Sequence, residues 1–193
     1  MKPMTVFLAG ILMASLLGCA ASGGSRPPVR DLDSSRLAPG LATLYFDQFY
    51  RYIHQIPEGD DAVSEGRSGS PVMVIDHQFG EDEVFDSGRS QGVGVQFSGF
   101  IHLESAGDYR FQALSNDGVA IYIDGVEILS DPRVHPDRLS EIGSFSSLGG
   151  WYPFLIRYFQ RKGTAALSVY WQPPDAEAFT VVPASAYGHL KTE

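Results

Sequence analysis

The chain has 193 residues, 44% of them hydrophobic, and 23 acidic against 14 basic side chains give it a formal net charge of −9. An acidic chain without a basic stripe lacks the attraction to phosphates that dominates nucleic-acid binding, so we expect no nucleic-acid partner. The 21 glycines and 12 prolines favour many short strands joined by tight turns over a helix bundle.

Residues 1–18 have the pattern of an export signal peptide. Lys2 supplies a positive charge, and an almost wholly apolar run follows from Val6 to Leu17. This run is shorter than the ~20 residues that a membrane-spanning helix needs. The sequence Leu16-Leu17-Gly18-Cys19 resembles the lipobox of bacterial lipoproteins, which implies cleavage before Cys19 and its acylation. The alternative is a plain secretory signal with an incidental cysteine.

Residues 19–39 are predicted to form a lipidated cysteine followed by a flexible tether. Cys19 is the only cysteine of the chain, so the folded part has no disulfide and no cysteine-based zinc site. Several acyl chains on one residue would hold the protein durably at a membrane. Ala20 follows the cysteine in place of an aspartate, which by analogy with bacterial sorting favours the outer membrane of the cell envelope. Gly23-Gly24 and Pro27-Pro28 are typical of a tether.

Residues 40–190 are predicted to form one domain, since about 150 residues suit a single hydrophobic core. Tyr45 to Ile56 is the best helix candidate, and an irregular extension of the first strand is the alternative. Val93 to Leu103 alternates apolar with small or polar residues, as a half-buried strand does. We expect it to pair with Asp108 to Leu114 across a turn at Ser105-Ala106-Gly107.

The stretch from Gly107 to Gly125 shows the strongest strand pattern. Alternate residues from Tyr109 to Ala113, and again from Val119 to Ile123, are apolar and share one face of an extended chain. Asp117-Gly118 and Asp124-Gly125 end these runs with residues that tolerate positive φ, so each predicts a turn.

Another hairpin is predicted near the C-terminal end of the chain. Trp151 to Gln160 and Thr164 to Trp171 are its strands, and Lys162-Gly163 is its turn. Asp131 to Ser140 contains two prolines and is predicted to be a loop between core strands.

Ser115, Asn116 and Asp117 place three oxygen-bearing side chains next to one another at the first predicted turn, which we expect to be an open corner. Calcium takes six to eight oxygen ligands, so Asn116 and Asp117 are candidate calcium ligands. The alternative is a solvated turn whose side chains bond their own backbone.

Segments along nearly the whole chain after residue 39 resemble one known family. They are Gly40-Leu41, Tyr45-Phe46, Phe97-Ser98-Gly99-Phe100-Ile101, Gly107-Asp108-Tyr109-Arg110-Phe111, Ser115-Asn116-Asp117-Gly118, Ile123-Asp124-Gly125, Gly150-Trp151-Tyr152-Pro153, Arg157-Tyr158, Leu167 to Trp171 and Val182-Pro183. In this order they resemble the PA-14 (PA14) domain family, named after the anthrax toxin protective antigen. The resemblance implies an all-β fold, an antiparallel β-sandwich or flattened barrel, and a module that often binds carbohydrate without catalysis.

The resemblance also implies a ligand site at the corner. In the calcium-dependent sugar binders of the family the turn holds two adjacent aspartates joined by a cis peptide, and Asn116 stands here in place of the first. Asparagine keeps a carbonyl oxygen but removes one negative charge, which weakens a calcium site. The candidate ligand-binding residues are Ser115, Asn116, Asp117, Gly118 and Tyr122. Asn116 and Asp117 would accept bonds from sugar hydroxyls or hold calcium, and Gly118 would let the ligand approach the backbone.

No pattern in the sequence predicts catalysis. Gly88-Arg89-Ser90-Gln91-Gly92 matches the Gly-x-Ser-x-Gly pattern of hydrolases, but the strand-to-helix context is missing. The five histidines are scattered without metal-ligand spacing. We therefore predict a lipid-anchored envelope protein that binds a glycan and is not an enzyme. The alternative is an interaction module that packs against a partner protein of the envelope.

Overall fold

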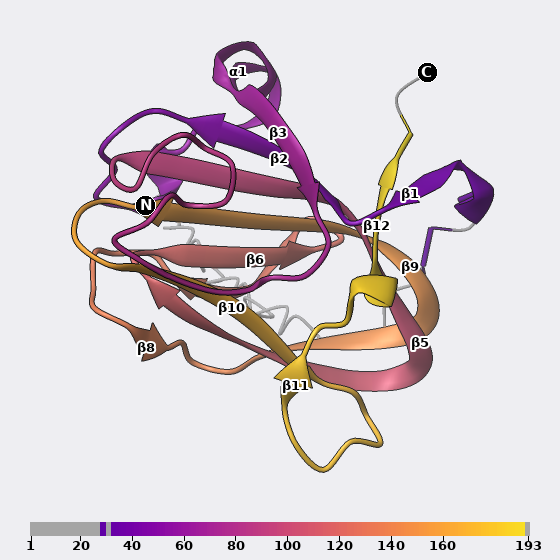
Figure 1. Ribbon diagram of the computed structural model, residues 1–193. Helices are drawn as coiled ribbons and strands as arrows, with labels where there is room; N and C mark the ends of the chain where they lie inside the picture. The colour runs from indigo at the N-terminus through magenta and orange to yellow at the C-terminus, as the bar shows by residue number, and fades with distance from the viewer. Residues whose placement is uncertain (1–27, 30–31, 192–193) are drawn as a thin grey trace, which may run out of the picture.

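The computed structural model describes residues 28–29 and 32–191, whose regular structure is mainly β-strand (Figure 1). The strands are β1 (Leu37–Pro39), β2 (Leu41–Phe46), β3 (Arg67–Val72), β4 (Asp76–Gly80), β5 (Val93–Asn116), β6 (Val119–Ile123), β7 (Val126–Asp131), β8 (Arg138–Leu139), β9 (Gly143–Gln160), β10 (Ala165–Gln172), β11 (Thr180–Val181) and β12 (Tyr187–Leu190). The helices in this part are α1 (Gly59–Glu65) and the 3-10 helices η1 (Ser34–Arg36), η2 (Ile53–Gln55) and η3 (Ala184–Ala186). The predicted lipobox with Cys19 lies outside the described residues.

Two long strands, β5 and β9, organise the sheet. They pair antiparallel from Val93 opposite Gln160 to Phe111 opposite Gly143, with a register shift between Leu103 and Ala106. Figure 1 shows both strands curving together at the end of the molecule that carries β1 and β12. Because both strands bend, each takes part in both layers of the fold.

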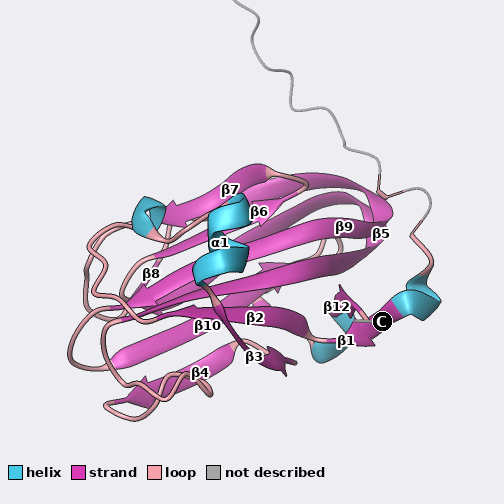
Figure 2. Ribbon diagram, turned by 90° about the horizontal axis from the view of Figure 1, so that it is seen from above, coloured by secondary structure: helices cyan, strands magenta, loops and turns pink. Residues whose placement is uncertain are grey.

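The strands form an antiparallel β-sandwich, as predicted, and the sheet does not close into a barrel. The first half of β5 pairs with β2, which pairs with β3, and the second half of β9 pairs with β6, which pairs with β7. The second half of β5 pairs instead with β10, which also pairs with β4 and β11. Figure 2 looks down on α1, which lies outside the layer that contains β2.

The apolar core lies between the layers. Alternate residues of β5 such as Val95 and Phe97 are fully buried, as are Ile121 of β6 and Ile156 of β9. Burying each of these side chains contributes about 1.5–3 kcal/mol, so this period-two pattern fixes which face of each strand points inward. A smaller cluster packs Phe159 of β9 and Ala120 of β6 against residues of the segment that joins β2 to α1.

Two predicted hairpins are wrong. Ser105 to Gly107 do not reverse the chain, because β5 continues from Val93 to Asn116 and pairs with β9 on both sides of the bend. The glycine signal marks this bend instead, since Gly107 has a φ of +136° and Gly149, on the facing strand, has a φ of +84°. At the second site, Lys162-Gly163 carries the chain from β9 into the other layer, where β10 pairs with β5.

The shorter elements follow the local sequence more closely. Asp124 and Gly125 have φ values of +51° and +73° and join β6 to β7, so the hairpin turn predicted there is confirmed. Tyr45 to Ile56 is not an α-helix. β2 ends at Phe46 and an irregular segment with η2 follows, as the alternative reading held. No helix among residues 28–29 and 32–191 is long and apolar enough to cross a membrane.

Candidate functional site

The corner at Asn116 and Asp117 joins the two layers of the sandwich. The peptide bond between these residues is cis, as the family resemblance implies. The predicted glycine turn between two paired strands is not present at this corner. Neither Asp117 nor Gly118 has a positive φ. The strand that follows, β6, pairs with β9 and not with β5. The chain therefore leaves β5 in one layer and enters β6 in the other.

The side chain of Asp117 faces inward and holds two neighbouring loops. Its Oδ1 accepts a hydrogen bond from the backbone N–H of His135 at 3.1 Å, and its Oδ2 accepts one from the backbone N–H of Arg161 at 2.7 Å. Burial raises the pKa of Asp117 above the usual value of an aspartate, although both N–H groups act against this rise. With Asp117 only 2% exposed, the expectation of a corner open to solvent is wrong.

Asn116 continues this network and is 7% exposed. Its Nδ2 donates to Asp137 Oδ1 at 2.8 Å and to Thr164 Oγ1 at 3.2 Å. Its backbone carbonyl accepts a hydrogen bond from the Tyr158 hydroxyl at 2.6 Å. Ser115, next to it, is fully buried. These contacts fix the positions of the loops on either side of the corner.

Gly118 is buried at the start of β6 against an aromatic ring. A Cβ added to Gly118 would lie 2.5 Å from the Phe159 ring, so no larger residue fits without a shift of the ring or of the strand. The absence of a side chain is thus required by packing inside the fold. The sequence instead predicts that glycine at position 118 lets a ligand approach the backbone.

Tyr122 lies three residues beyond Val119 on β6, roughly 10 Å further along the strand. Its hydroxyl donates to Glu127 Oε2 at 2.9 Å. Tyr122 lines a separate hollow of about 520 Å³ on the sheet face, together with Gln96 and Ser98 of β5. The structure therefore does not bring Tyr122 to the corner, contrary to what its closeness in sequence suggested.

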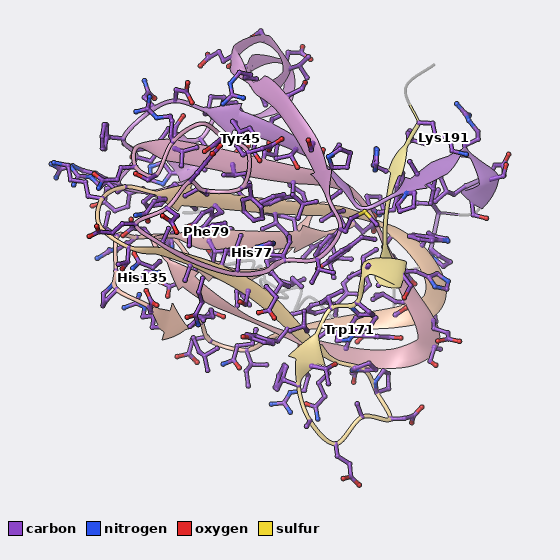
Figure 3. The ribbon with its side chains drawn as sticks, in the orientation of Figure 1. Tyr45, His77, Phe79, His135, Trp171 and Lys191 are labelled. Atoms are coloured by element: carbon purple, nitrogen blue, oxygen red, sulfur yellow. The ribbon has the colours of Figure 1, made fainter. Side chains whose placement is uncertain are left out.

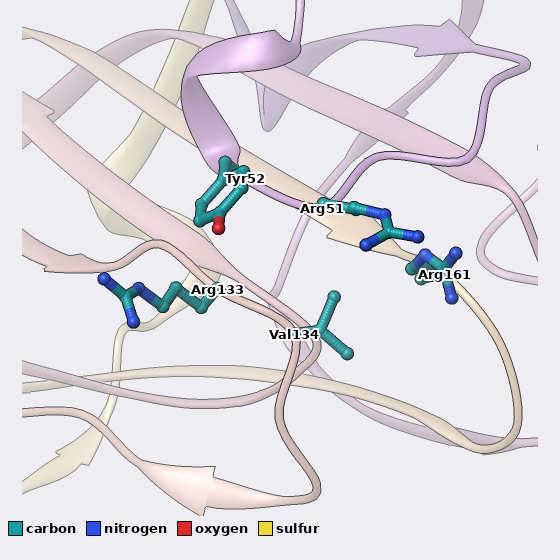
Figure 4. Close-up of a pocket in the computed structure, with 5 residues that line it drawn as sticks. All are labelled: Arg51, Tyr52, Arg133, Val134 and Arg161. Atoms are coloured by element: carbon teal, nitrogen blue, oxygen red, sulfur yellow. The ribbon is translucent and has the colours of Figure 1, made fainter.

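A hollow of about 320 Å³ lies beside the corner, and we call it the arginine hollow. It is lined by Arg51, Tyr52, Arg133, Val134 and Arg161. Figure 4 shows Arg51 and Arg161 on one side, and Arg133 on the other side below the ring of Tyr52, with Val134 between the two sides. The neighbouring His135 is labelled in Figure 3, at the end of the molecule away from Trp171 and Lys191.

The corner and the arginine hollow share the same loops. Asp117 binds the backbone N–H of Arg161, which lines the hollow, and the backbone N–H of His135, which follows Val134. The third segment of the hollow carries Arg51 and Tyr52. An isolated β-bridge between Tyr52 and Arg133 connects it to the loop that follows β7. The Asp117 carboxylate is thus a positioning group for two of the three segments that form the hollow.

A second carboxylate braces the loop that follows β7. Asp131 accepts a hydrogen bond from Arg138 Nε at 2.7 Å, and its Oδ2 lies 3.3 Å from His135 Nε2. The hydrogen bonds from Arg138 hold the pKa of Asp131 below its usual value. The pairing of Asp131 with Arg138 therefore stabilises the folded protein at pH values above the usual pKa of an aspartate. This stabilisation is lost as the pH falls through the lowered pKa of Asp131.

The arrangement of oxygen atoms at the corner does not fit calcium. Both oxygens of Asp117 already accept backbone N–H groups, and Asn116 presents its amide nitrogen to Asp137. Among residues 28–29 and 32–191, no group of three or more His, Cys, Asp or Glu side chains is placed to hold a metal ion. Calcium favours several carboxylate and carbonyl oxygens that are free to point at the ion.

The lining residues of the arginine hollow were not predicted from the sequence. Arg51, Arg133 and Arg161 come from three loops far apart in the chain, and no motif spacing links them. The signals available were Arg161-Lys162 at a predicted turn and Arg133 in the predicted loop between Asp131 and Ser140. Two basic residues at a turn of an acidic chain are a weak local signal, and only the fold brings them together.

The fold defines the class of this protein: an antiparallel β-sandwich module with a buried cis corner at one end. The model of the PA14 domain matches residues 37–185, which is more than half of the chain. The chain therefore belongs to the PA14 domain family. A comparison with curated protein sequences found no match.

Several solved structures share this fold. The PA14 domain of the MpAFP antifreeze protein is 16% identical with a TM-score of 0.67, over 88% of this chain and 96% of that chain. The epithelial adhesin 9 A domain from Candida glabrata, in complex with Galβ1-3GlcNAc, is 14% identical with a TM-score of 0.65, over 86% and 96%. The PA14 sugar-binding domain from an RTX adhesin is 16% identical with a TM-score of 0.64, over 79% and 99%.

This chain also matches two anti-sigma factor domain-containing proteins, one of them from Clostridium clariflavum, and it spans about half of their length, 48% and 49%. The TM-scores of these two matches are 0.64 and 0.63 at 17% and 19% identity. At such identities the likeness concerns the fold.

Proposed function

We propose that this domain binds a glycan without catalysing a reaction on it, and that the arginine hollow beside the Asn116–Asp117 corner is the binding site. The observation that carries the proposal is the position of this hollow, beside the Asn116–Asp117 corner of a PA14 fold and on loops that Asp117 holds in place. Sugar-binding domains among the structural neighbours support it.

The lining side chains have the chemistry of a sugar site. Arg51, Arg133 and Arg161 carry fixed, planar donor groups that can bond hydroxyl or acidic oxygens. Tyr52 adds an aromatic ring with a polar tip, which suits the apolar face of a sugar ring in a half-wet site. In this scheme Asp117 and Asn116 position the loops, while the arginines and Tyr52 contact the ligand.

A glycan array tests the proposal on the full chain, with calcium and with EDTA in parallel. We expect a defined set of glycans to be retained, and we expect the same signals in EDTA because the arginines supply the positive charge at the site. An array without any retained glycan would contradict the proposed function. Signals that disappear in EDTA would show that a metal ion is required.

We also propose that the domain is held at the bacterial cell envelope, with the outer membrane as the favoured location, by acyl chains on Cys19. The lipobox Leu16-Leu17-Gly18-Cys19 supports this proposal. The Cys19→Ala chain is expected to move from the membrane fraction to the soluble fraction of lysed cells, because one residue carries all the acyl chains. Equal membrane retention of both chains would contradict lipid anchoring at this residue.

A further inference from the structure

The arginines of the hollow have no acidic partner among the described residues, a property that they share with Arg89 and Arg110 but not with three other arginines of the domain. Arg67, Arg138 and Arg157 each lie within 4.0 Å of a carboxylate oxygen. Within residues 28–29 and 32–191, Arg51, Arg133 and Arg161 form no such ion pair. Three positive side chains therefore surround one hollow in a chain whose net charge is −9.

The acidic side chains near the hollow are engaged elsewhere. Asp117 is buried and bonded to two backbone N–H groups, and Asp131 is paired with Arg138. Asp137 accepts the hydrogen bond from Asn116, and Asp47 lies 4.0 Å from Arg67. The charge of Arg161 acts on the Asp117 carboxylate, but among the described residues none of these carboxylates forms an ion pair with an arginine of the hollow. Like charges gathered at one place repel one another.

Two further contacts shape the hollow for a ring that carries an acidic group. The Arg133 guanidinium lies 6.0 Å from the centre of the Tyr52 ring, so a cation and an aromatic face lie together on one wall. On the opposite side, Arg161 Nε is buried and makes no hydrogen bond within the described part of the chain. A ligand reaches a guanidinium through its solvent-facing N–H groups, and two of these match the two oxygens of a carboxylate or sulfate in bidentate geometry.

We infer that the arginine hollow selects acidic saccharides, meaning sugars that bear a carboxylate or a sulfate, over neutral ones. This inference rests on the proposed function, because it names the ligand class of the same site. The guanidinium groups of Arg51, Arg133 and Arg161 bind the acidic group, and the Tyr52 ring packs against the sugar.

The test titrates the full chain with uronic-acid and sulfated oligosaccharides and with their neutral counterparts, in which the carboxylates are methyl-esterified or the sulfates removed. Inorganic sulfate is the control for an anion without a sugar. We expect the acidic oligosaccharides to bind at least about tenfold more tightly than the neutral counterparts, with an affinity that falls as salt is added. Sulfate alone should bind much more weakly.

The variants Arg133→Gln and Arg161→Gln should each weaken binding of the acidic oligosaccharide about tenfold. Arg110→Gln is the matched control, because Arg110 is exposed and bonds Gln172 on another part of the surface. Circular dichroism verifies folding of each variant, and the Asp117 contact uses the backbone of Arg161, which Arg161→Gln retains.

The possible failures can be told apart. Neutral counterparts that bind as tightly as the acidic forms would overturn the inference and leave the proposed function standing. Wild-type binding by both Arg133→Gln and Arg161→Gln would also overturn the inference alone. Inorganic sulfate that binds as tightly as the acidic oligosaccharides would do so too. Absence of binding to every saccharide, acidic and neutral, would overturn the proposed function and the inference together.

Discussion

The Asp117→Ala chain is expected to lose about 2–4 kcal/mol of its free energy of unfolding and to lose glycan binding. The carboxylate of Asp117 accepts the backbone N–H groups of His135 and Arg161, and an alanine would leave both donors without an acceptor. An unsatisfied buried donor costs about 1–3 kcal/mol. Since both loops line or flank the arginine hollow, the site should lose its shape as well.

Urea denaturation and the glycan array measure these two effects. Asp117→Asn serves as a partial variant, because its amide oxygen keeps one acceptor and it should therefore lose less stability than Asp117→Ala. Glu177→Ala, at an exposed position, is the control for removal of a carboxylate. An Asp117→Ala chain as stable as the Glu177→Ala chain would show that Asp117 does not hold these loops.

Replacing Arg157 with alanine is expected to cost about 2–4 kcal/mol, which for a domain of this size lowers the melting temperature by roughly 4–16 °C. The Arg157 side chain is 2% exposed and donates hydrogen bonds to the carbonyl of Ile56 and to the Glu58 carboxylate. These bonds fasten the segment between β2 and α1 to the sheet. The same segment carries Arg51 and Tyr52, so glycan binding should weaken too.

Calorimetry of Arg157→Ala beside Arg110→Ala measures this contribution. Arg110 is exposed and makes a surface hydrogen bond with Gln172, so its replacement should change the melting temperature by little. If both variants melt at the same temperature, Arg157 does not fasten the segment. Wild-type glycan binding by a destabilised Arg157→Ala chain would place Arg51 and Tyr52 outside the site.

Much of the fold follows from local patterns in the sequence. Alternating apolar residues such as those from Val119 to Ile123 are buried on one face, and Asp124-Gly125 forms the predicted turn. The failures at Ser105 to Gly107 and at Lys162-Gly163 have a common cause. Glycine permits a bend or a crossing as readily as a reversal, and the choice depends on which distant strand supplies the hydrogen bonds.

The candidate site was located from the sequence only at the corner itself. Its cis geometry agrees with the family resemblance, but its burial depends on His135 and Arg161, which lie 18 and 44 residues further along the chain. The arginines of the hollow come from separate loops, so their grouping exists only after the two layers have packed. Tyr122 was grouped with the corner residues because it is close to them in sequence, but an extended strand carries it to a separate hollow.

The most direct test of the binding site is a map of backbone amide shifts in the NMR spectrum of the protein as a retained glycan is added. If the arginine hollow beside Asn116 and Asp117 is the site, the largest shifts will fall on the amides of the three segments that carry Arg51, Val134 and Arg161. Shifts that gather instead around Gln96, Ser98 and Tyr122, at the hollow on the sheet face, would contradict this assignment.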